Sequence, residues 1–211
     1  MIRRIKNDFN FQKFRKKDYH KAIQFAIKGM HFDWYIKNKL LLNLYGRYFW
    51  YLELNRATEI IALYHEDVLA GVLLAEISGA PKAHTSFGQM MYIKLFEFLQ
   101  NSFAKESAGA YDAGNNQLLS EYLSDHSPDG EIIFLAANPD IPIKGIGTRL
   151  LDELQKRVQG KEIYLFTDSA CTYQFYEKRG FQRQKEKMIS LKLPNKKIDL
   201  QCMLYSKVID K

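Results

Sequence analysis

The stretch from Glu131 to Leu154 places an apolar strand, a glycine-containing turn and a helix in direct succession. The run Ile132–Ala137 has the length of a strand, and Gly145 and Gly147 precede a helical pattern with leucines on one face. The first N–H groups of a helix lack partners within the helix, and glycine lets a ligand approach the backbone closely. We therefore expect this turn to bind an anion, such as a phosphate group of a cofactor.

Two common nucleotide-binding motifs do not fit this turn. A dinucleotide-binding fold requires G-x-G-x-x-G, but Leu150 stands at the third glycine position. A P-loop requires Gly-Lys-Ser/Thr, which does not occur here. The alternative is a plain tight turn without a ligand.

A second stretch, residues 162–181, contains another apolar strand and a short helix that ends at Gly180-Phe181. Together the two stretches resemble the GNAT superfamily of acyl-CoA N-acyltransferases. The family's motif Arg/Gln-x-x-Gly-x-Gly/Ala is similar to Pro142–Gly147, and its signature Tyr-Glu-Lys-x-Gly-Phe is matched by Tyr176–Phe181. The resemblance covers residues 131–193 best. Pro142 departs from the family's Arg/Gln and offers no hydrogen bond from its side chain.

The resemblance implies one mixed α/β domain over residues 1–211, with flanking helices on a mixed central sheet and acetyl-CoA as the cofactor. Main-chain groups on a splayed strand would pair with the pantetheine arm, and backbone N–H groups at the turn would hold the pyrophosphate. Ser169 stands where the family often has asparagine, and Tyr173 lies one helical turn before Tyr176. The predicted cofactor residues are Leu135, Ala137, Lys144, Gly145, Ile146, Gly147, Thr148, Ser169 and Tyr173.

Tyr176 matches the family's tyrosine that protonates the leaving thiolate, a role that a phenol can fill. Tyr173 is a second candidate for this role, and the alternative for Tyr176 is a core tyrosine with a satisfied hydroxyl group. The sequence indicates no single base for the amine. We name Glu76 as the predicted base; the other candidates are Glu59, His84, His126 and Asn138. Neither a metal site nor a nucleophilic cysteine is expected.

The predicted function is transfer of an acetyl group from acetyl-CoA to a primary amine, by direct attack. The acceptor is an unidentified small molecule or a protein amino group. Residues 41–184 carry 13 Lys/Arg and 18 Asp/Glu, which favours a cationic amine in an acidic cleft. The alternative is a non-catalytic acyl-CoA-binding regulatory module, which Pro142 and the missing base suggest.

The other segments have weaker patterns. Residues 33–52 predict a strongly aromatic helix, which either lines a substrate pocket or belongs to the core and a dimer face. Residues 78–130 predict a helical insertion before the cofactor strand, which either covers the acceptor cleft or is a surface elaboration. The remaining expected elements are a strand at 9–14, a helix at 18–30, strands at 58–64 and 68–77, insertion helices at 89–104 and 115–123, and strands at 187–193 and 198–209.

The chain of 211 residues contains no apolar run of the ~20 residues that a membrane span requires, and its start does not resemble a signal peptide. Only two cysteines occur, which favours a reducing cytoplasm. Residues 1–40 carry eleven Lys/Arg and three Asp/Glu, a balance of +8 within a net charge of +7. Their helical spacing favours a solvated helix face over a nucleic-acid interface. Domains of this kind are often homodimers.

Overall fold

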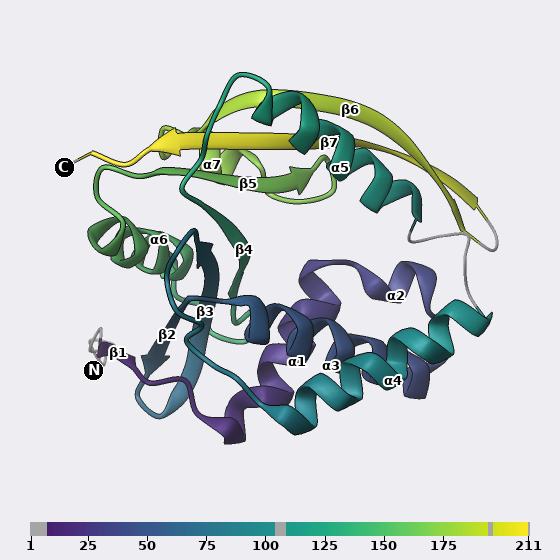
Figure 1. Cartoon of the computed structure of the whole chain (residues 1–211). Helices are drawn as coiled ribbons and strands as arrows, with labels where there is room; N and C mark the ends of the chain where they lie inside the picture. Colours follow the sequence, from purple (N-terminus) through teal and green to yellow (C-terminus); the bar gives the residue numbers. More distant parts are fainter. Residues whose placement is uncertain (1–7, 104–108, 194–195, 211) are drawn as a thin grey trace.

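A computed structural model describes residues 8–103, 109–193 and 196–210 (Figure 1). They form a single mixed α/β domain around a seven-stranded sheet of order β1-β2-β3-β4-β5-β7-β6. The strands are β1 (Phe9–Gln12), β2 (Glu59–His65), β3 (Val68–Ile77), β4 (Gly130–Ala137), β5 (Glu162–Asp168), β6 (Gln182–Leu193) and β7 (Lys196–Val208). The helices are α1 (Tyr19–Gly29), α2 (Phe32–Tyr35), α3 (Lys39–Arg56), α4 (Phe87–Phe103), α5 (Gly109–Leu123), α6 (Ile146–Arg157) and α7 (Gln174–Glu177), with a 3₁₀ turn at Lys16–Asp18.

The sheet opens between β4 and β5, its one parallel pair within the described residues. These strands pair at Gly130 with Ile163 and at Glu131 with Tyr164, and the described ladder ends there. On its other edge, β4 pairs with β3 as far as Ala137. The register between these two strands shifts at Ile133, which is an extra residue in β4. A bulge of this kind bends a strand and increases its twist. The splay that the resemblance required is therefore present.

Helices cover both faces of the sheet. One core cluster packs α6 against residues of β2, β3, β5 and β7, and α7 follows β5 next to it. On the opposite face α1 and α3 pack against β2 to β4, while α5 packs against β6 and β7. Two separate helical groups thus share this face, and the opening between β4 and β5 lies between them (Figure 1).

Close packing positions α6. Its buried residues Ile146, Leu150, Leu151 and Leu154 follow the predicted helical stripe. A Cβ atom on Gly71 of β3 would lie 2.7 Å from the Ile146 side chain and 2.9 Å from the Ala136 carbonyl oxygen. The absence of a side chain at Gly71 thus allows the start of α6 to lie next to the end of β4.

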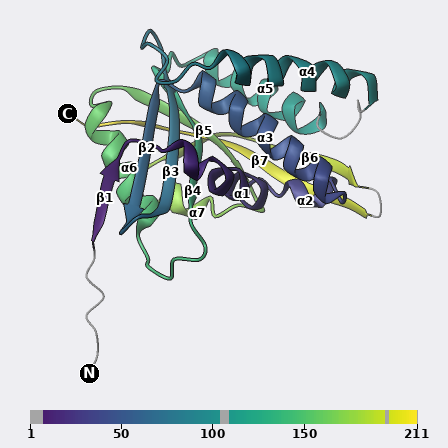
Figure 2. The ribbon, with the colours of Figure 1, turned by 90° about the horizontal axis from the view of Figure 1, so that it is seen from below.

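Two predicted helices differ from the observed ones. The helix predicted at 33–52 is divided into α2 and α3, because the Asn38 side chain caps α3 by accepting hydrogen bonds from the N–H groups of Leu40 and Leu41. Helix α5 begins at Gly109 and not at Asn115. β1 forms the edge of the sheet next to β2, as Figure 2 shows. In the described part of the chain, no helix combines the length and the apolar character that crossing a membrane requires.

Candidate active site

The predicted phosphate turn has the geometry of an anion site. Gly145 caps α6 with a φ of 90°, a left-handed conformation that glycine adopts without strain. A Cβ atom built on Gly145 would meet no described protein atom within 4 Å, so this side of the backbone is open to a ligand. Lys144 and Gly145 are both exposed.

The first turn of α6 offers free donors. The first helical hydrogen bond runs from the Arg149 N–H to the Gly145 carbonyl oxygen, at 3.0 Å. In the described structure the N–H groups of Ile146, Gly147 and Thr148 have no backbone acceptor. Such groups at a helix N-terminus attract negative charge. The Thr148 hydroxyl group is already used, because it accepts a hydrogen bond from Arg179.

Arg179 joins the phosphate turn to α7. Its guanidinium group also donates to the Phe175 carbonyl oxygen at 2.9 Å and stacks 3.7 Å over the Phe175 ring. That ring in turn lies 3.2 Å from the position of a Cβ on Gly147. The turn and the helix that carries Tyr176 are therefore held together by direct contacts.

Leu135 and Ala137 lie on the part of β4 that is no longer paired with β5. Their partners in β3 are Leu73 and Gly71. The other edge of β4 lacks a paired strand beyond Glu131 in the described sheet, so main-chain groups on this edge are available to an extended ligand. The structure thus brings both predicted residues to the open edge, close to the start of α6.

Tyr176 is half-buried in α7, next to Phe175, which lies against the start of α6. Its ring contacts Phe175 and Phe181 at centroid distances of 5.1 Å and 5.9 Å. Its hydroxyl group makes no hydrogen bond within the part of the chain that the structure describes. Burial, and then the nearby Cys171 thiol, raise the pKa of Tyr176 above its ordinary value. The phenol therefore stays protonated at neutral pH.

Ser169 and Tyr173 lie between β5 and α7. The Ser169 hydroxyl group accepts a hydrogen bond from the Gln201 N–H at 3.1 Å, which leaves it one proton to donate. Tyr173 packs against the core, with the Arg183 guanidinium group 5.4 Å from its ring centre. Burial raises the pKa of Cys171 to about 11, which is unsuited to a nucleophilic thiolate. Both cysteines are free thiols.

Glu76, the predicted base, is held by two cations. One oxygen accepts a hydrogen bond from Arg56 at 2.9 Å, and the other pairs with Lys82. Although partial burial opposes it, the hydrogen bonds from Lys82 and Arg56 lower the pKa of Glu76. A carboxylate with both oxygens paired and a lowered pKa is a poor proton acceptor at neutral pH, so the environment of Glu76 does not favour the predicted role.

The sequence interpretation missed Glu53 and Glu131, which share Arg56 with Glu76. Arg56 donates to Glu53 at 3.2 Å and also to Glu131, which accepts a further hydrogen bond from the Tyr164 hydroxyl group. Glu53 is 8% exposed, and burial raises its pKa to about 7 despite Arg56. The i, i+3 spacing of Glu53 and Arg56 on a helix was the available signal.

Glu53 should make stability depend on pH. Its folded-state pKa of about 7 exceeds the ordinary value of 4.5, so the folded state retains a proton that the unfolded chain loses between these values. Its contribution is fully present below pH 4.5 and is lost as the pH rises through 7. We expect the free energy of unfolding to fall by on the order of 2 kcal/mol from pH 5 to pH 8, relative to a Glu53→Gln variant. Urea unfolding at both pH values measures this difference, and parallel curves for the two proteins would contradict it.

A large cavity of about 1370 Å³ lies on the sheet face that carries α3 and α5. Residues of α2, α3, α4 and α5 line it, and its floor contains Ile133 at the β4 bulge and Phe166 to Asp168 at the end of β5. Both insertion helices therefore contribute to its wall. Cys171, whose thiol lies near Tyr176, lines the cavity, and so do Glu53 and Arg56.

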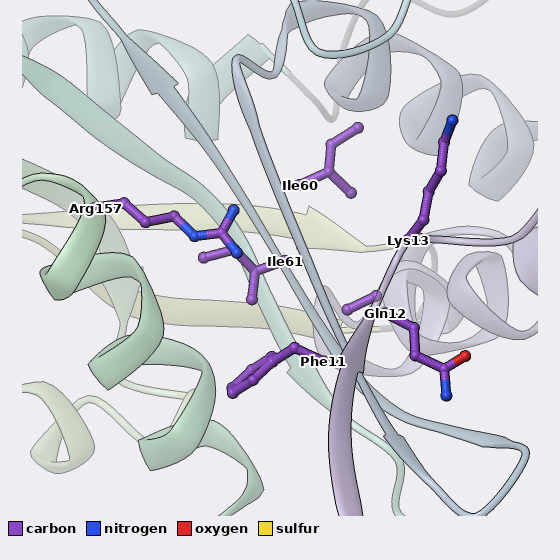
Figure 3. A pocket seen from close by; sticks show the side chains of 7 residues that line it. Phe11, Gln12, Lys13, Ile60, Ile61 and Arg157 are labelled. Carbon is purple, nitrogen blue, oxygen red and sulfur yellow. The ribbon is translucent and has the colours of Figure 1, made fainter.

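A second, smaller pocket of about 260 Å³ lies at the β1–β2 edge (Figure 3). Arg157 reaches into it, but its guanidinium group is already paired with Glu59 and Glu153. The pocket is lined mainly by β1 and β2, with Arg157 from the end of α6, whereas the anion turn lies at the opposite end of that helix. It is therefore not a candidate for the same site.

Comparison with known proteins agrees with this fold. Residues 19–181 match the model of the acetyltransferase (GNAT) family. PaiA N-acetyltransferase from Thermoplasma acidophilum, in complex with coenzyme A, is 15% identical over 95% of this chain and 99% of that chain, with a TM-score of 0.52. The ribosomal-protein-S18-alanine N-acetyltransferase from Escherichia coli is 12% identical over 96% and 95%, with a TM-score of 0.52.

The C-terminal condensation domain of Ebony, in complex with beta-alanyl-dopamine, shares the fold as well. It is 10% identical over 97% of this chain and 100% of that chain, with a TM-score of 0.56. No curated protein matches the sequence. At these identities the structural neighbours show the fold, while the family match rests on the sequence itself.

Proposed function

Because the chain belongs to the acetyltransferase (GNAT) family, we propose that it is an acetyl-CoA-dependent N-acetyltransferase that transfers the acetyl group to a primary amine. The observation that supports this proposal is that the edge of β4, the start of α6 and helix α7 meet. A Cβ on Gly147 of α6 would lie 3.2 Å from the ring of Phe175, the neighbour of Tyr176, and 3.5 Å from the Leu135 side chain of β4.

The cofactor would span the first two features. The N–H groups of Ile146, Gly147 and Thr148 would hold the pyrophosphate, with Lys144 beside it, and the pantetheine arm would lie along Leu135 and Ala137. The open space at Gly145 and the unpaired β4 edge fit such a ligand. The PaiA structure, which has the same fold, contains coenzyme A. Ser169 and Tyr173 would contact the arm from the other side.

The chemistry follows from where charge develops. A neutral amine would attack the thioester carbonyl carbon, and a main-chain N–H on the open edge of β4 would stabilise the oxyanion. The carbon–sulfur bond then breaks, and the leaving thiolate needs a proton. Tyr176, which stays protonated at neutral pH, would supply it.

Thiol release upon mixing the protein with acetyl-CoA and a panel of amines tests this function. Turnover that depends on the amine supports it. Tight coenzyme A binding without turnover on any amine would instead support the alternative of a non-catalytic acyl-CoA-binding regulatory module, for which Pro142 in the motif remains the main argument.

The phosphate turn can be tested separately with Gly145→Ala. At a φ of 90° a Cβ atom costs about 1–2 kcal/mol and tilts the N–H groups of the turn. We expect the dissociation constant for coenzyme A to rise about tenfold in calorimetry. Gly88→Ala is the control, because a Cβ at Gly88 also meets nothing within 4 Å and its φ is not positive. Equal affinities for both variants would place the phosphates elsewhere.

A further inference from the structure

The cavity is larger than transfer to a small amine requires. Its volume of about 1370 Å³ exceeds the ~300–1,000 Å³ of typical pockets for drug-sized ligands. Ile133 and Cys171 line the cavity near the proposed reacting end, whereas most of the other lining residues belong to α2, α3, α4 and α5. The remainder extends between α3, α4 and α5, and the body of the acceptor would occupy it.

Aromatic rings form much of the wall of this cavity. Tyr48 of α3 stacks on Phe96 of α4, with ring centres 4.7 Å apart and planes 18° apart. Phe32 of α2 lies edge-on to Tyr45 at 4.8 Å, which extends the wall. Such faces favour an aromatic ligand over a strongly hydrated one, because rings stack and exclude water.

The mouth of the cavity is apolar as well. Leu41, Leu95 and Leu99 line it and are 47%, 59% and 46% exposed. An apolar ligand that covers these side chains removes their surface from water, which is favourable by about 25 cal/mol per Å². A sugar or a polyamine would gain little from this surface.

Carboxyl groups in the wall favour a cation. Asp112 lies at the rim, and partial burial raises its pKa without an ion pair among the described residues. Glu53 lies deeper and shares a single arginine with two other glutamates. With Lys82 included, three carboxyl groups face two cations, so this group carries a net negative charge when Glu53 is ionised. An ammonium group placed here relieves that imbalance.

We propose that the acceptor is a primary amine with a bulky aromatic body, which the aromatic wall holds while the amine nitrogen faces Glu53. The proposal rests on the acetyltransferase function. Before attack, one N–H bond of the ammonium breaks and its proton passes to a Glu53 carboxylate oxygen. The neutral amine then forms the C–N bond as the C–S bond breaks.

Glu53 suits this step better than its neighbours do. Its pKa of about 7 is close to the pH at which such enzymes operate. Unlike Glu76 and Glu131, it lines the cavity. The charged and titratable groups around it are Arg56 from α3, Glu76 from β3, Glu131 from β4, Tyr164 from β5 and Lys82 from the loop before α4.

An amine panel tests the class of acceptor. With acetyl-CoA we expect kcat/KM for phenethylamine and diphenylpropylamine to exceed the values for spermidine, glucosamine and an alanine-terminated peptide at least tenfold. Binding can be followed without turnover through tryptophan fluorescence. Trp34 lines the cavity, whereas the other tryptophan, Trp50, is fully buried and does not line it. Saturable quenching of this fluorescence by diphenylpropylamine would show that the cavity binds such amines, and acetylation of the same amine would identify it as an acceptor.

Two phenylalanines of α4 give a matched pair of variants. Phe96→Ala removes part of the aromatic wall and should raise KM for the aromatic amines at least fivefold, with unchanged coenzyme A affinity. Phe87→Ala removes a 76% exposed ring that does not line the cavity, and it should leave KM unchanged. Equal effects of the two variants would overturn the assignment of the wall.

The pH profile tests Glu53. We expect the kcat/KM of the wild type to rise through an apparent pKa near 7, and Glu53→Gln to lose this limb and about 30-fold in rate at pH 8. Glu53→Asp should retain the limb at a lower rate. Coenzyme A binding shows that each variant is folded. If Glu76→Gln removes the limb and Glu53→Gln keeps it, Glu53 is not the proton acceptor.

Three outcomes overturn the proposed acceptor. In the first, kcat/KM is higher for spermidine, glucosamine or the peptide than for the aromatic amines. In the second, kcat/KM with a small amine is higher for octanoyl-CoA than for acetyl-CoA, which would place the acyl chain in the cavity. In the third, the aromatic amines neither react nor quench Trp34 fluorescence. The acetyltransferase function itself is excluded only if coenzyme A does not bind, or if no amine causes release of the coenzyme A thiol from acetyl-CoA.

Discussion

The Tyr176→Phe variant is expected to lose about 10²- to 10³-fold in kcat with acetyl-CoA and its best amine. The substitution keeps the ring that packs on Phe175 and Phe181 and removes only the hydroxyl group. The leaving thiolate then lacks its proton donor, while the main-chain contacts to the cofactor remain. Coenzyme A affinity should therefore stay within about twofold of the wild type, because the loss belongs to the chemical step.

Tyr173→Phe provides the comparison for this prediction. Tyr173 was the second candidate for the same role, one helical turn earlier in sequence, but it packs against the core and faces Arg183. We expect this variant to keep most of its activity. Single-turnover measurements of thiol release separate chemistry from product release. A full rate in Tyr176→Phe combined with a large loss in Tyr173→Phe would transfer the role to Tyr173.

The Arg56→Ala variant is expected to have the largest effect on stability. Arg56 pairs with Glu53, Glu76 and Glu131, so its removal leaves three carboxylates near one another with Lys82 as the remaining cation. Loss of one partner of a buried ion pair costs about 3–5 kcal/mol. Because the Arg56 side chain is 35% exposed, we expect the free energy of unfolding to fall by about 2–4 kcal/mol at pH 8.

Urea unfolding measures this loss, and Arg47→Ala is the control on the same helix. Arg47 is exposed and forms no ion pair within the described residues, so its removal should change the free energy of unfolding by less than about 0.5 kcal/mol. The Arg56→Ala loss should shrink at pH 5, where Glu53 is protonated. A loss that does not change with pH would mean that repulsion among the carboxylates is not its cause.

The strand, turn and helix of the proposed cofactor site could be predicted because their sequence signals are local. A strand of apolar residues, two glycines and a leucine stripe specify β4, the turn and α6 within residues 131–154. By contrast, the break between α2 and α3 was missed, because aromatic residues before and after Asn38 suggested one continuous helix.

Glu76 and Glu53 illustrate why sequence alone does not identify a base. Both are single glutamates in regular elements, and neither residue type nor spacing tells which is paired. Three-dimensional contacts place Lys82 and Arg56 on the two oxygens of Glu76, while Glu53 lies buried at the cavity wall. Burial and neighbouring charges set a pKa, and both depend on residues distant in the chain.

The amino-acid sequence by itself determined the family, the mixed α/β fold and the glycine turn before α6, because these depend on short-range patterns and on glycines with special backbone conformations. Only the tertiary structure decided which face the insertion helices cover, how large the cavity is and which glutamate faces it. These properties arise where α3, α4, α5 and the splayed strands meet, and segments separated by many residues meet only through packing.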